Sequence, residues 1–302
     1  MSASVKRPLL IVLTGPTASG KTALALKLAQ EYGCSIISAD SRQVFRELAI
    51  GSAAPSKEEM QNIPHYFIGS HSIHEPFNAG MFETECTLLL QRLFLENPIQ
   101  ILCGGTGLYI KAILQGLNEL PEADATLRME LENQWTENPD ELISELKQKD
   151  PDFAQKADLN NSRRVLRALE VIRISGIPYS KQRTGEKKTL FFDNQCFALM
   201  PDREELYKRI NQRSPIMLEN GWLDEARSLA EFRNTNALQT VGYKELFEVI
   251  DGNLSLDKAV ELIQMNTRRY AKRQITWIKN QLECDWLKPE DAFEKIKSKI
   301  NS

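Results

Sequence analysis

The chain has 302 residues, of which 42% are hydrophobic and 26% charged, and its formal net charge is −3. This composition predicts a packed globular protein of one or two domains and excludes a disordered chain, while the slight negative charge excludes general coating of nucleic acid but allows a local basic groove. The five cysteines form no Cys-x-x-Cys pair, so we expect neither a disulfide framework nor a zinc site, in keeping with a reducing cytosol. The longest apolar runs are too short for a membrane span, and no membrane partner is expected.

The first predicted elements surround a phosphate-binding motif. Residues 9–14 predict a buried strand, and residues 21–32 predict a helix that Gly33 ends. Between strand and helix lies the complete pattern G-x-x-x-x-G-K-[ST], whose backbone N–H groups and helix N-terminus bind a diphosphate. We expect Lys21 to contact phosphate oxygens and the Thr22 hydroxyl to take a Mg²⁺ ligand position. The predicted diphosphate-binding residues are Gly15, Pro16, Thr17, Ala18, Ser19, Gly20, Lys21 and Thr22.

Two more strands follow, and each ends in a distinctive loop. Residues 35–38 predict a short strand that ends at Asp40, and residues 99–103 predict a third strand, followed by Gly104-Gly105 and a helix over 108–115. A strand–helix–strand unit predicts a parallel sheet, and ligands of such sheets bind at the carboxyl ends of the strands. The phosphate loop, residues 40–43 and residues 104–109 are therefore expected to meet at one crevice.

The middle of the chain has a different pattern, because residues 118–194 contain three predicted helices (125–137, 140–149 and 162–175) and no convincing strand. Further strands are expected at 196–200 and 285–287, with helices between them at 207–218 and 257–282. We therefore predict a catalytic core from 1–117 and 195–302, interrupted by a helical insertion, 118–194, that acts as a lid or a second wall.

Asp40 is the candidate catalytic acid or base. It ends a strand at the crevice, where it could accept a proton from a substrate. A helix N-cap and an indirect Mg²⁺ contact are equally open interpretations. The third strand has no acid at its end, which disfavours an ordinary nucleotide-hydrolysing motor.

Basic residues form two clusters on predicted helices. Arg163, Arg164 and Arg167 share a helix face by their i,i+3 and i,i+4 spacing, and residues 268–273 include four cations. In an acidic chain these clusters favour a polyanion larger than a nucleotide, although a solvated helix face is the simpler alternative. Arg209 and Arg213 also share a face, and one of them could hold a phosphate opposite the loop.

The ordered motifs resemble those of the tRNA dimethylallyltransferases, also called tRNA isopentenyltransferases, nearly from end to end. Besides the phosphate loop, the similar segments are Asp40-Ser-Arg-Gln43, Gly104-Gly-Thr-Gly-Leu-Tyr109, Arg163-Arg-Val-Leu-Arg-Ala-Leu-Glu170, Thr240-Val-Gly-Tyr243 and Ala271-Lys-Arg-Gln-Ile-Thr-Trp277. The resemblance implies an α/β fold with a phosphate-loop NTPase-like parallel core. It also implies transfer of a dimethylallyl group from its diphosphate to the N6 amine of adenosine 37, beside the anticodon.

The resemblance assigns roles to individual residues. Asp40 would accept the amine proton, while Lys21, Arg213 and Thr22 with Mg²⁺ would neutralise the leaving diphosphate. The adenosine would be flipped out of the anticodon loop, with Gln43 bonding the base and Thr106 aligning it. The residues that the resemblance implies for tRNA binding are Asp40, Ser41, Arg42, Gln43, Thr106, Arg128, Arg163, Arg164, Val165, Leu166, Arg167, Lys272, Arg273 and Gln274.

The sequence departs from the family pattern at Phe45, where tyrosine is common, and at Ala54, where lysine is common. The chain lacks the C-terminal zinc finger of eukaryotic relatives, so a bacterial-type enzyme is expected. A cytoplasmic location is expected from the cysteine pattern, and a monomer is the default expectation. Nucleoside triphosphates are potential competitors for the loop. Three other readings stay open: a small-molecule kinase, an adenylate isopentenyltransferase that acts on free nucleotides, and a non-catalytic RNA-binding module.

Overall fold

The computed structural model describes residues 7–118, 120–182 and 188–301. It divides into two compact units, one of residues 1–115 with 189–302 and one of residues 116–188. The larger unit contains the whole sheet, and the described part of the smaller unit is helical. The sequence placed the boundaries of the insertion at 118 and 194, a little later at both ends.

The sheet of the larger unit has six parallel strands in the order β3-β2-β4-β1-β5-β6. Their bounds are β1 (Leu9–Thr14), β2 (Ile36–Ser38), β3 (His65–Tyr66), β4 (Ile99–Cys103), β5 (Asp193–Leu199) and β6 (Asp285–Leu287). The expected parallel α/β class is confirmed. The connection after β1 leads toward β2 on one side of the sheet, and the connection after the adjacent strand β4 leads to β5 on the other side. In such folds a ligand crevice forms between two strands whose connections diverge in this way.

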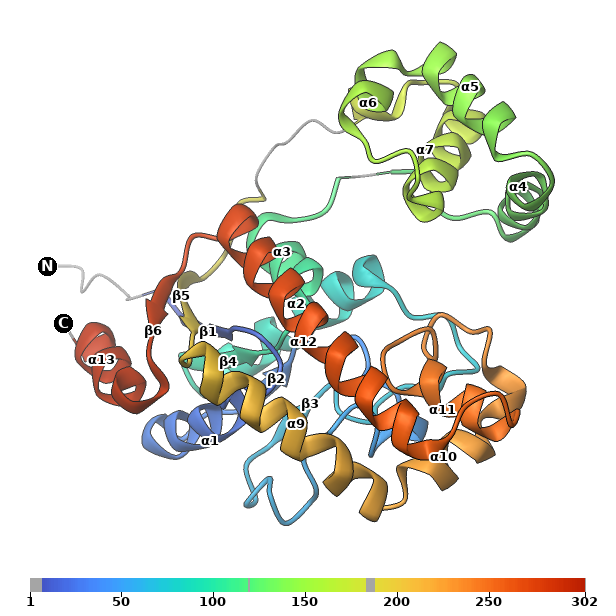
Figure 1. The fold of residues 1–302 in the computed structure, drawn as a ribbon. Helices are drawn as coiled ribbons and strands as arrows, with labels where there is room; N and C mark the ends of the chain where they lie inside the picture. The colour runs from blue at the N-terminus through green and yellow to red at the C-terminus, as the bar shows by residue number, and fades with distance from the viewer. Residues whose placement is uncertain (1–6, 119, 183–187, 302) are drawn as a thin grey trace, which may run out of the picture. The chain divides into compact units, whose positions relative to one another are not determined.

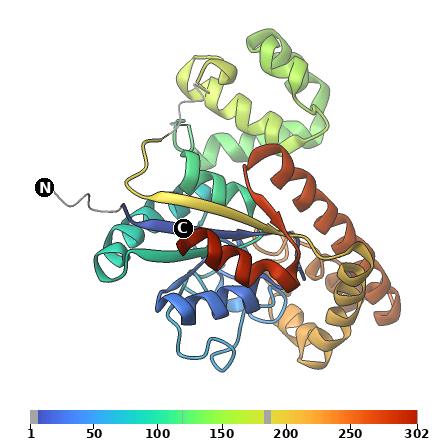
Figure 2. The same ribbon diagram turned by 90° about the vertical axis from the view of Figure 1, so that its left-hand side faces the viewer.

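Helices cover both faces of the sheet (Figures 1 and 2). Alternate residues of β1 therefore pack into two different cores, one on each face. Ile11 and Leu13 pack with α1 (Lys21–Tyr32) and α13 (Pro289–Asn301). Leu10 and Val12 pack in the core on the other face, which includes α2 (Ala79–Glu96) and α3 (Gly107–Gln115). A strand buried on both faces needs a continuous apolar sequence, as residues 9–13 have.

The C-terminal half of the larger unit is mostly helical. Long helices α9 and α12 pack against each other, and α11 packs on α10 and α12. Their bounds are α9 (Arg203–Glu219), α10 (Trp222–Ser228), α11 (Tyr243–Ile250) and α12 (Leu256–Gln281). A 3₁₀ turn, η2 (Ala230–Phe232), follows α10, and another, η1 (Arg46–Leu48), lies in the loop after β2. Together α9 and α12 carry Arg213, Lys272, Arg273 and Gln274 of the predicted site.

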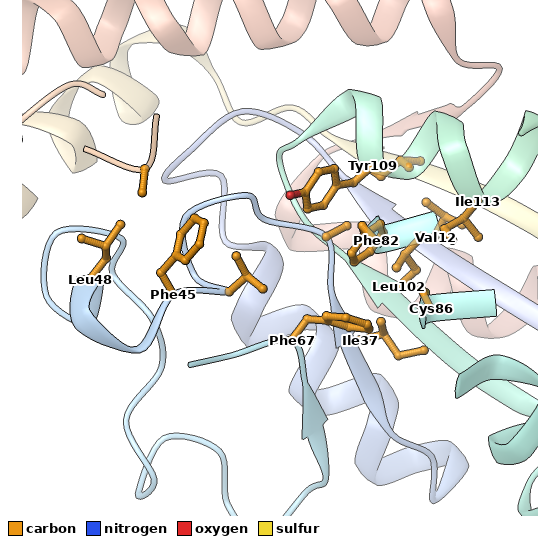
Figure 3. Packing of buried hydrophobic residues seen from close by; sticks show 14 of the residues in the cluster. Val12, Ile37, Phe45, Leu48, Phe67, Phe82, Cys86, Leu102, Tyr109 and Ile113 are labelled. Atoms are coloured by element: carbon orange, nitrogen blue, oxygen red, sulfur yellow. The ribbon is translucent and has the colours of Figure 1, made fainter. Parts of the chain in front are cut away.

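Aromatic packing fixes the loop that follows β2 (Figure 3). The rings of Phe82 and Tyr109 stack with centroids 4.2 Å apart, which joins α2 to α3. Phe45 and Leu48 are buried in the same core, so these two side chains anchor the segment that follows Asp40 to that core. Phe45, the departure from the family pattern, serves this packing.

The smaller unit has its own hydrophobic core, formed around Leu131, Leu146 and Val165. Its helices are α4 (Ala125–Glu137), α5 (Pro139–Lys149), α6 (Pro151–Lys156), α7 (Ser162–Ser175) and α8 (Tyr179–Gln182). Glu170 is fully buried beside this core and accepts a hydrogen bond from Arg167 at 2.8 Å. A buried carboxylate of this kind requires a cationic partner.

One expectation about cysteines is wrong, because Cys196 and Cys284 form a disulfide. The two residues are 88 positions apart, so their spacing gives no sequence signal. They become neighbours because β5 and β6 pair in parallel, with Phe197 opposite Asp285.

Among the described residues, no helix is both long enough and apolar enough to cross a membrane.

Candidate active site

The phosphate loop has the backbone that its glycines predict. Gly15 has φ of 138°, and a Cβ there would lie 2.6 Å from the Leu199 carbonyl oxygen. Gly20 has φ of 92° and Ala18 has φ of 62°, both in the left-handed region. Any side chain at Gly15 would therefore push the loop away from the end of β5, and a left-handed alanine requires support from its surroundings.

Lys21 lies within the loop that it serves. Its Nζ donates to the carbonyl oxygens of Gly15 at 3.0 Å and Pro16 at 2.7 Å. Burial lowers the pKa of Lys21 to about 8, although the attraction of Asp40 works in the opposite direction. An ammonium with so few water contacts gains strongly from an anionic ligand.

Asp40 faces the same charged groups. Its Oδ1 accepts from the backbone N–H of Arg42 at 2.9 Å, closing a local turn. This turn precedes η1 by several residues, so Asp40 does not cap a helix. The Asp40 carboxylate acts on the pKa of Lys21 and on that of Arg213, raising both. These three side chains are therefore close enough for their charges to interact.

Arg213 comes to the site from α9. Its Nη1 donates to the Thr17 hydroxyl at 3.1 Å. Burial lowers the pKa of Arg213, and the attraction of the Asp40 carboxylate opposes this shift. By contrast, Arg209 forms an exposed pair with Glu205 at 2.8 Å. Arg209 is nevertheless close to the phosphate loop, because a Cβ on Gly20 would lie 3.7 Å from its Nη1. Arg209 and Arg213 are therefore both near the predicted anion site.

Thr106 and Gln43 lie on adjacent loops. The Thr106 hydroxyl accepts from the backbone N–H of Ser41 at 2.9 Å, which ties the β4–α3 turn to the loop after β2. Gln43 donates to the Ala53 carbonyl oxygen at 3.2 Å and accepts from Ser38 at 2.9 Å. The amide of Gln43 is therefore held in one orientation, as recognition of a base edge would require.

The residues predicted on α12 separate into two groups. Lys272 and Arg273 are exposed and line a groove of about 490 Å³ with Trp277. Gln274 is only 8% exposed and bonds to backbone groups of two loops of the same unit. The side chains of Lys272 and Arg273 are accessible to an RNA, whereas that of Gln274 is occupied within the protein.

The residues predicted on the insertion also separate. Arg163 and Arg164 are exposed at the start of α7. Arg167 bonds to Glu170 and, at 2.7 Å, to the Pro121 carbonyl oxygen, and Arg128 lies 3.5 Å from Glu170. The side chains of Val165 and Leu166 are buried in the core of the smaller unit, which corrects their assignment as direct contacts of tRNA. The helix period explains this, because residues 165 and 166 point away from the face of 163 and 164.

Sequence reasoning missed one acidic residue beside the site. The Glu225 carboxylate accepts from the backbone N–H groups of Ile50 and Gly51, both at 2.8 Å, and from the Tyr243 hydroxyl at 2.5 Å. It thereby holds the loop that contains Ala53, the partner of Gln43. The Thr240–Tyr243 motif was the available signal, since a buried tyrosine hydroxyl needs an acceptor.

The implied Mg²⁺ can be tested against the groups present. Thr22 is exposed on the first turn of α1, next to Lys21. Among the described residues there is no group of three or more His, Cys, Asp or Glu that could hold a metal. One hydroxyl with diphosphate oxygens and waters is a donor set that Mg²⁺ accepts, because this ion keeps several of its waters. The residues therefore fit a metal that arrives with its substrate.

A complete phosphate loop, an acid at the next strand and a helical insertion with exposed arginines define a phosphate-loop enzyme with a second, helical unit. The chain belongs to the IPP transferase family, whose profile matches residues 43–281. It is 48% identical to a tRNA dimethylallyltransferase of Cytophaga hutchinsonii, over 94% of each chain. It is 43% identical to tRNA dimethylallyltransferase 1 of Bacteroides thetaiotaomicron, over 95% of this chain and 94% of the relative.

Solved structures give the same result. A tRNA isopentenylpyrophosphate transferase of Staphylococcus epidermidis superposes with a TM-score of 0.70 at 35% identity, covering 98% of this chain and 99% of its own. A eukaryotic dimethylallyltransferase acting on tRNA superposes with a TM-score of 0.81 at 28% identity, covering 96% of this chain and 77% of its own. The family resemblance inferred from the motifs is confirmed.

Proposed function

We propose that this chain is a tRNA dimethylallyltransferase that moves the dimethylallyl group of dimethylallyl diphosphate to N6 of adenosine 37. The observation that carries the proposal is the shared crevice of Lys21, Arg213 and Asp40. Two cations at the phosphate loop suit a diphosphate leaving group, and a carboxylate beside them suits a proton acceptor. The likeness to the named relatives supports the same reaction.

Each residue has a separate task in this reaction. Lys21 and Arg213 bind the diphosphate and stabilise the charge that grows as its C–O bond breaks. Thr22 would hold Mg²⁺, which supplies further positive charge to the diphosphate. Asp40 orients the amine and takes its proton as the nitrogen bonds to the prenyl carbon. Gln43 and Thr106 hold the extruded base in line for this attack.

The tRNA is bound away from the reacting atoms by phosphate contacts. Arg163 and Arg164 of the insertion and Lys272 and Arg273 of α12 are exposed cations suited to an RNA backbone. Trp277, beside the last two, offers an aromatic face to a nucleotide base. These surfaces are not needed by a kinase or by an enzyme that prenylates free nucleotides. We place the reaction in the cytoplasm, where tRNA is found, and expect a monomer.

A labelling experiment tests the proposal against its alternatives. The protein is incubated with radiolabelled dimethylallyl diphosphate and Mg²⁺, and then with unmodified tRNA, AMP, ADP or ATP. Label in tRNA, lost when adenosine 37 is replaced by guanosine, is the expected result. Label in free nucleotides would indicate an adenylate isopentenyltransferase. Transfer of phosphate from [γ-³²P]ATP to a small molecule would indicate a kinase, and binding of tRNA without transfer would indicate an RNA-binding module.

A further inference from the structure

One buried amide on α12 connects two loops of the site. The Gln274 Oε1 accepts from the Thr17 backbone N–H at 2.8 Å, in the phosphate loop. Its Nε2 donates to the Gly105 carbonyl oxygen at 3.0 Å, in the turn between β4 and α3. The side chain is 8% exposed, so both bonds form where water competes poorly. A single side chain thus joins the loop for the diphosphate to the turn before Thr106.

The helix that carries this amide is held tightly against the turn. A Cβ on Gly105 would lie 2.5 Å from the Gln274 Nε2, and a Cβ on Gly107 would lie 2.1 Å from the Trp277 ring. These glycines allow α12 to approach the β4–α3 turn at two positions three residues apart, on successive turns of the helix. Gln274 is therefore packed closely against the turn and has little freedom to change its partners.

The chain of contacts continues to the catalytic carboxylate. Gly105 precedes Thr106, whose hydroxyl accepts from the Ser41 N–H at 2.9 Å. Ser41 follows Asp40, whose Oδ1 accepts from the Arg42 N–H at 2.9 Å. The link therefore runs from the phosphate loop through Gln274 and Thr106 to Asp40. Along it, the position of the leaving group is coupled to that of the proton acceptor.

The phosphate loop needs this support. Ala18, immediately after Thr17, adopts a left-handed φ of 62°. This backbone conformation costs energy in an alanine, so it persists only where contacts of the surrounding residues hold it in place. Thr17 is held twice, through its N–H by Gln274 and through its hydroxyl by Arg213 at 3.1 Å. The Thr17 hydroxyl accepts from Arg213, so its own proton is still available to a phosphate oxygen.

We infer that Gln274 is a positioning residue, which sets the distance between the diphosphate site and Asp40 through its two hydrogen bonds and does not itself contact tRNA. This inference rests on the proposed function and replaces the role that the sequence indicated for Gln274. Near neutral pH an amide supplies both a donor and an acceptor at this reach, whereas an ionised carboxylate offers acceptors alone and methionine offers neither a donor nor a strong acceptor.

Two substitutions of similar size separate positioning from packing. Gln274→Met keeps the volume and removes both bonds to the loops, together with a hydrogen bond to the Tyr270 hydroxyl on the same helix. Gln274→Glu keeps the bond to Thr17, but its carboxylate faces the Gly105 carbonyl oxygen and repels it. When protonated, the same group donates to that oxygen and restores both bonds, and burial favours this neutral form well above the usual carboxyl pKa of about 4.3. The Glu variant should therefore recover as the pH falls.

The measurement is kcat and KM for dimethylallyl diphosphate with saturating tRNA, from pH 5.5 to 8.5, and the Kd of inorganic diphosphate by calorimetry. We expect both variants to lose about 10- to 100-fold in kcat/KM at pH 8, as unpaired buried groups imply. The ratio of Glu variant to wild type should rise at least fivefold by pH 5.5, and the Met ratio should stay constant. The other titratable or charged groups at these loops (Lys21, Asp40, Arg42, Cys103, Arg213, Tyr270 and Arg273) are common to all three proteins, so the ratios to wild type remove most of their own titration.

Gln264→Met is the matched control, because Gln264 lies on the same helix and bonds to the Asn211 carbonyl oxygen at 3.1 Å, on α9. It should leave kcat/KM within about twofold of wild type, with thermal unfolding checked for all variants. A Met variant with wild-type kcat/KM, or a Glu ratio that stays flat with pH, would overturn the inference. Wild-type protein that fails to prenylate tRNA would instead contradict the proposed function, and the diphosphate Kd would then still decide the role of Gln274.

Discussion

Asp40 has two tasks in the site, and one substitution separates them. Its Oδ1 accepts from the Arg42 N–H to close a turn, and the carboxylate also lies near Lys21 and Arg213. Asparagine retains an oxygen for the turn but cannot accept a proton, so it removes the base without removing the local structure. Alanine removes both.

We therefore predict that Asp40→Asn lowers kcat by about 10²- to 10⁴-fold, the usual contribution of a general base. The KM for dimethylallyl diphosphate and the Kd for tRNA should change by less than about threefold. Single-turnover transfer and filter binding measure these quantities. If Asp40→Asn is active and Asp40→Ala is not, Asp40 supports the turn and another group accepts the proton.

Lys21 makes the reaction sensitive to alkaline pH. Burial lowers its pKa to about 8, so the free enzyme loses this positive charge as the pH rises above that value. We predict that kcat/KM for dimethylallyl diphosphate is level below about pH 7.5 and declines toward tenfold per pH unit above about pH 8.5. In Lys21→Arg, whose guanidinium stays charged, the residual activity should show no such decline below pH 10. A wild-type profile that is level to pH 9.5 would contradict the proposed role.

The lowered pKa of Lys21 also makes the unfolding free energy depend on pH, and this free energy rises over the pH range in which activity declines. Below about pH 8, Lys21 is charged in both the folded and the unfolded chain, and the penalty for burying the charge is fully present. Between about 8 and the ordinary value near 10.4, the unfolded chain binds more protons, so Lys21 contributes a rise in unfolding free energy with pH. Binding of a diphosphate removes this effect, because the anion favours the charged form.

At the scale of elements, α7 contains two kinds of arginine that the sequence could not distinguish. Arg163 and Arg164 are exposed, whereas Arg167 pairs at 2.8 Å with Glu170, which is 0% exposed. We predict that Arg163→Ala with Arg164→Ala weakens tRNA binding and reduces the slope of log K against log salt by about one to two. The unfolding free energy should change by less than about 0.5 kcal/mol, as for other surface changes.

Arg167→Ala provides the contrast on the same helix. It should lower the unfolding free energy by about 1–3 kcal/mol, less than the full cost of breaking a buried pair because Arg128 stays 3.5 Å from Glu170. Denaturant unfolding of both variants measures the difference. An Arg167→Ala protein of unchanged stability but weakened tRNA affinity would place Arg167 with the surface arginines after all.

Elements with a strong local pattern were the ones that sequence predicted well. Residues 9–14 and 99–103 are strands as expected, and helix α7 begins and ends at the predicted residues. The sequence analysis did not predict helix α2 or strand β3. Strand β3 has only two residues and forms because it pairs with β2, so it has no local pattern of its own. The site loops were placed correctly by the rule for parallel sheets. The sequence did not predict the partners of Gln274, Glu225 and Arg167. Those of Gln274 and Glu225 lie far away in the sequence, and the pairing of Arg167 with Glu170 depends on the burial of Glu170.

At the scale of the whole molecule, the two units have separate hydrophobic cores. Leu146 of α5 and Leu28 of α1 are both 0% exposed, one in the core of residues 116–188 and the other beneath the phosphate loop. Units with separate cores can open independently, so damage to one core should be local. Leucine-to-alanine substitutions at these two positions are chemically identical and differ only in the unit they affect.

We predict that Leu146→Ala speeds amide hydrogen exchange in residues 120–182 and weakens tRNA binding, while exchange in β1 and the Kd of inorganic diphosphate stay unchanged. Leu28→Ala should do the reverse, with faster exchange in β1 and α1 and weaker diphosphate binding. Each substitution is expected to lower the stability of its own unit by about 2–5 kcal/mol. Exchange followed by mass spectrometry reports both units in one experiment. If Leu146→Ala exposes β1 to the same extent as α5, the chain unfolds as one cooperative body, and the insertion is then an integral part of the catalytic core.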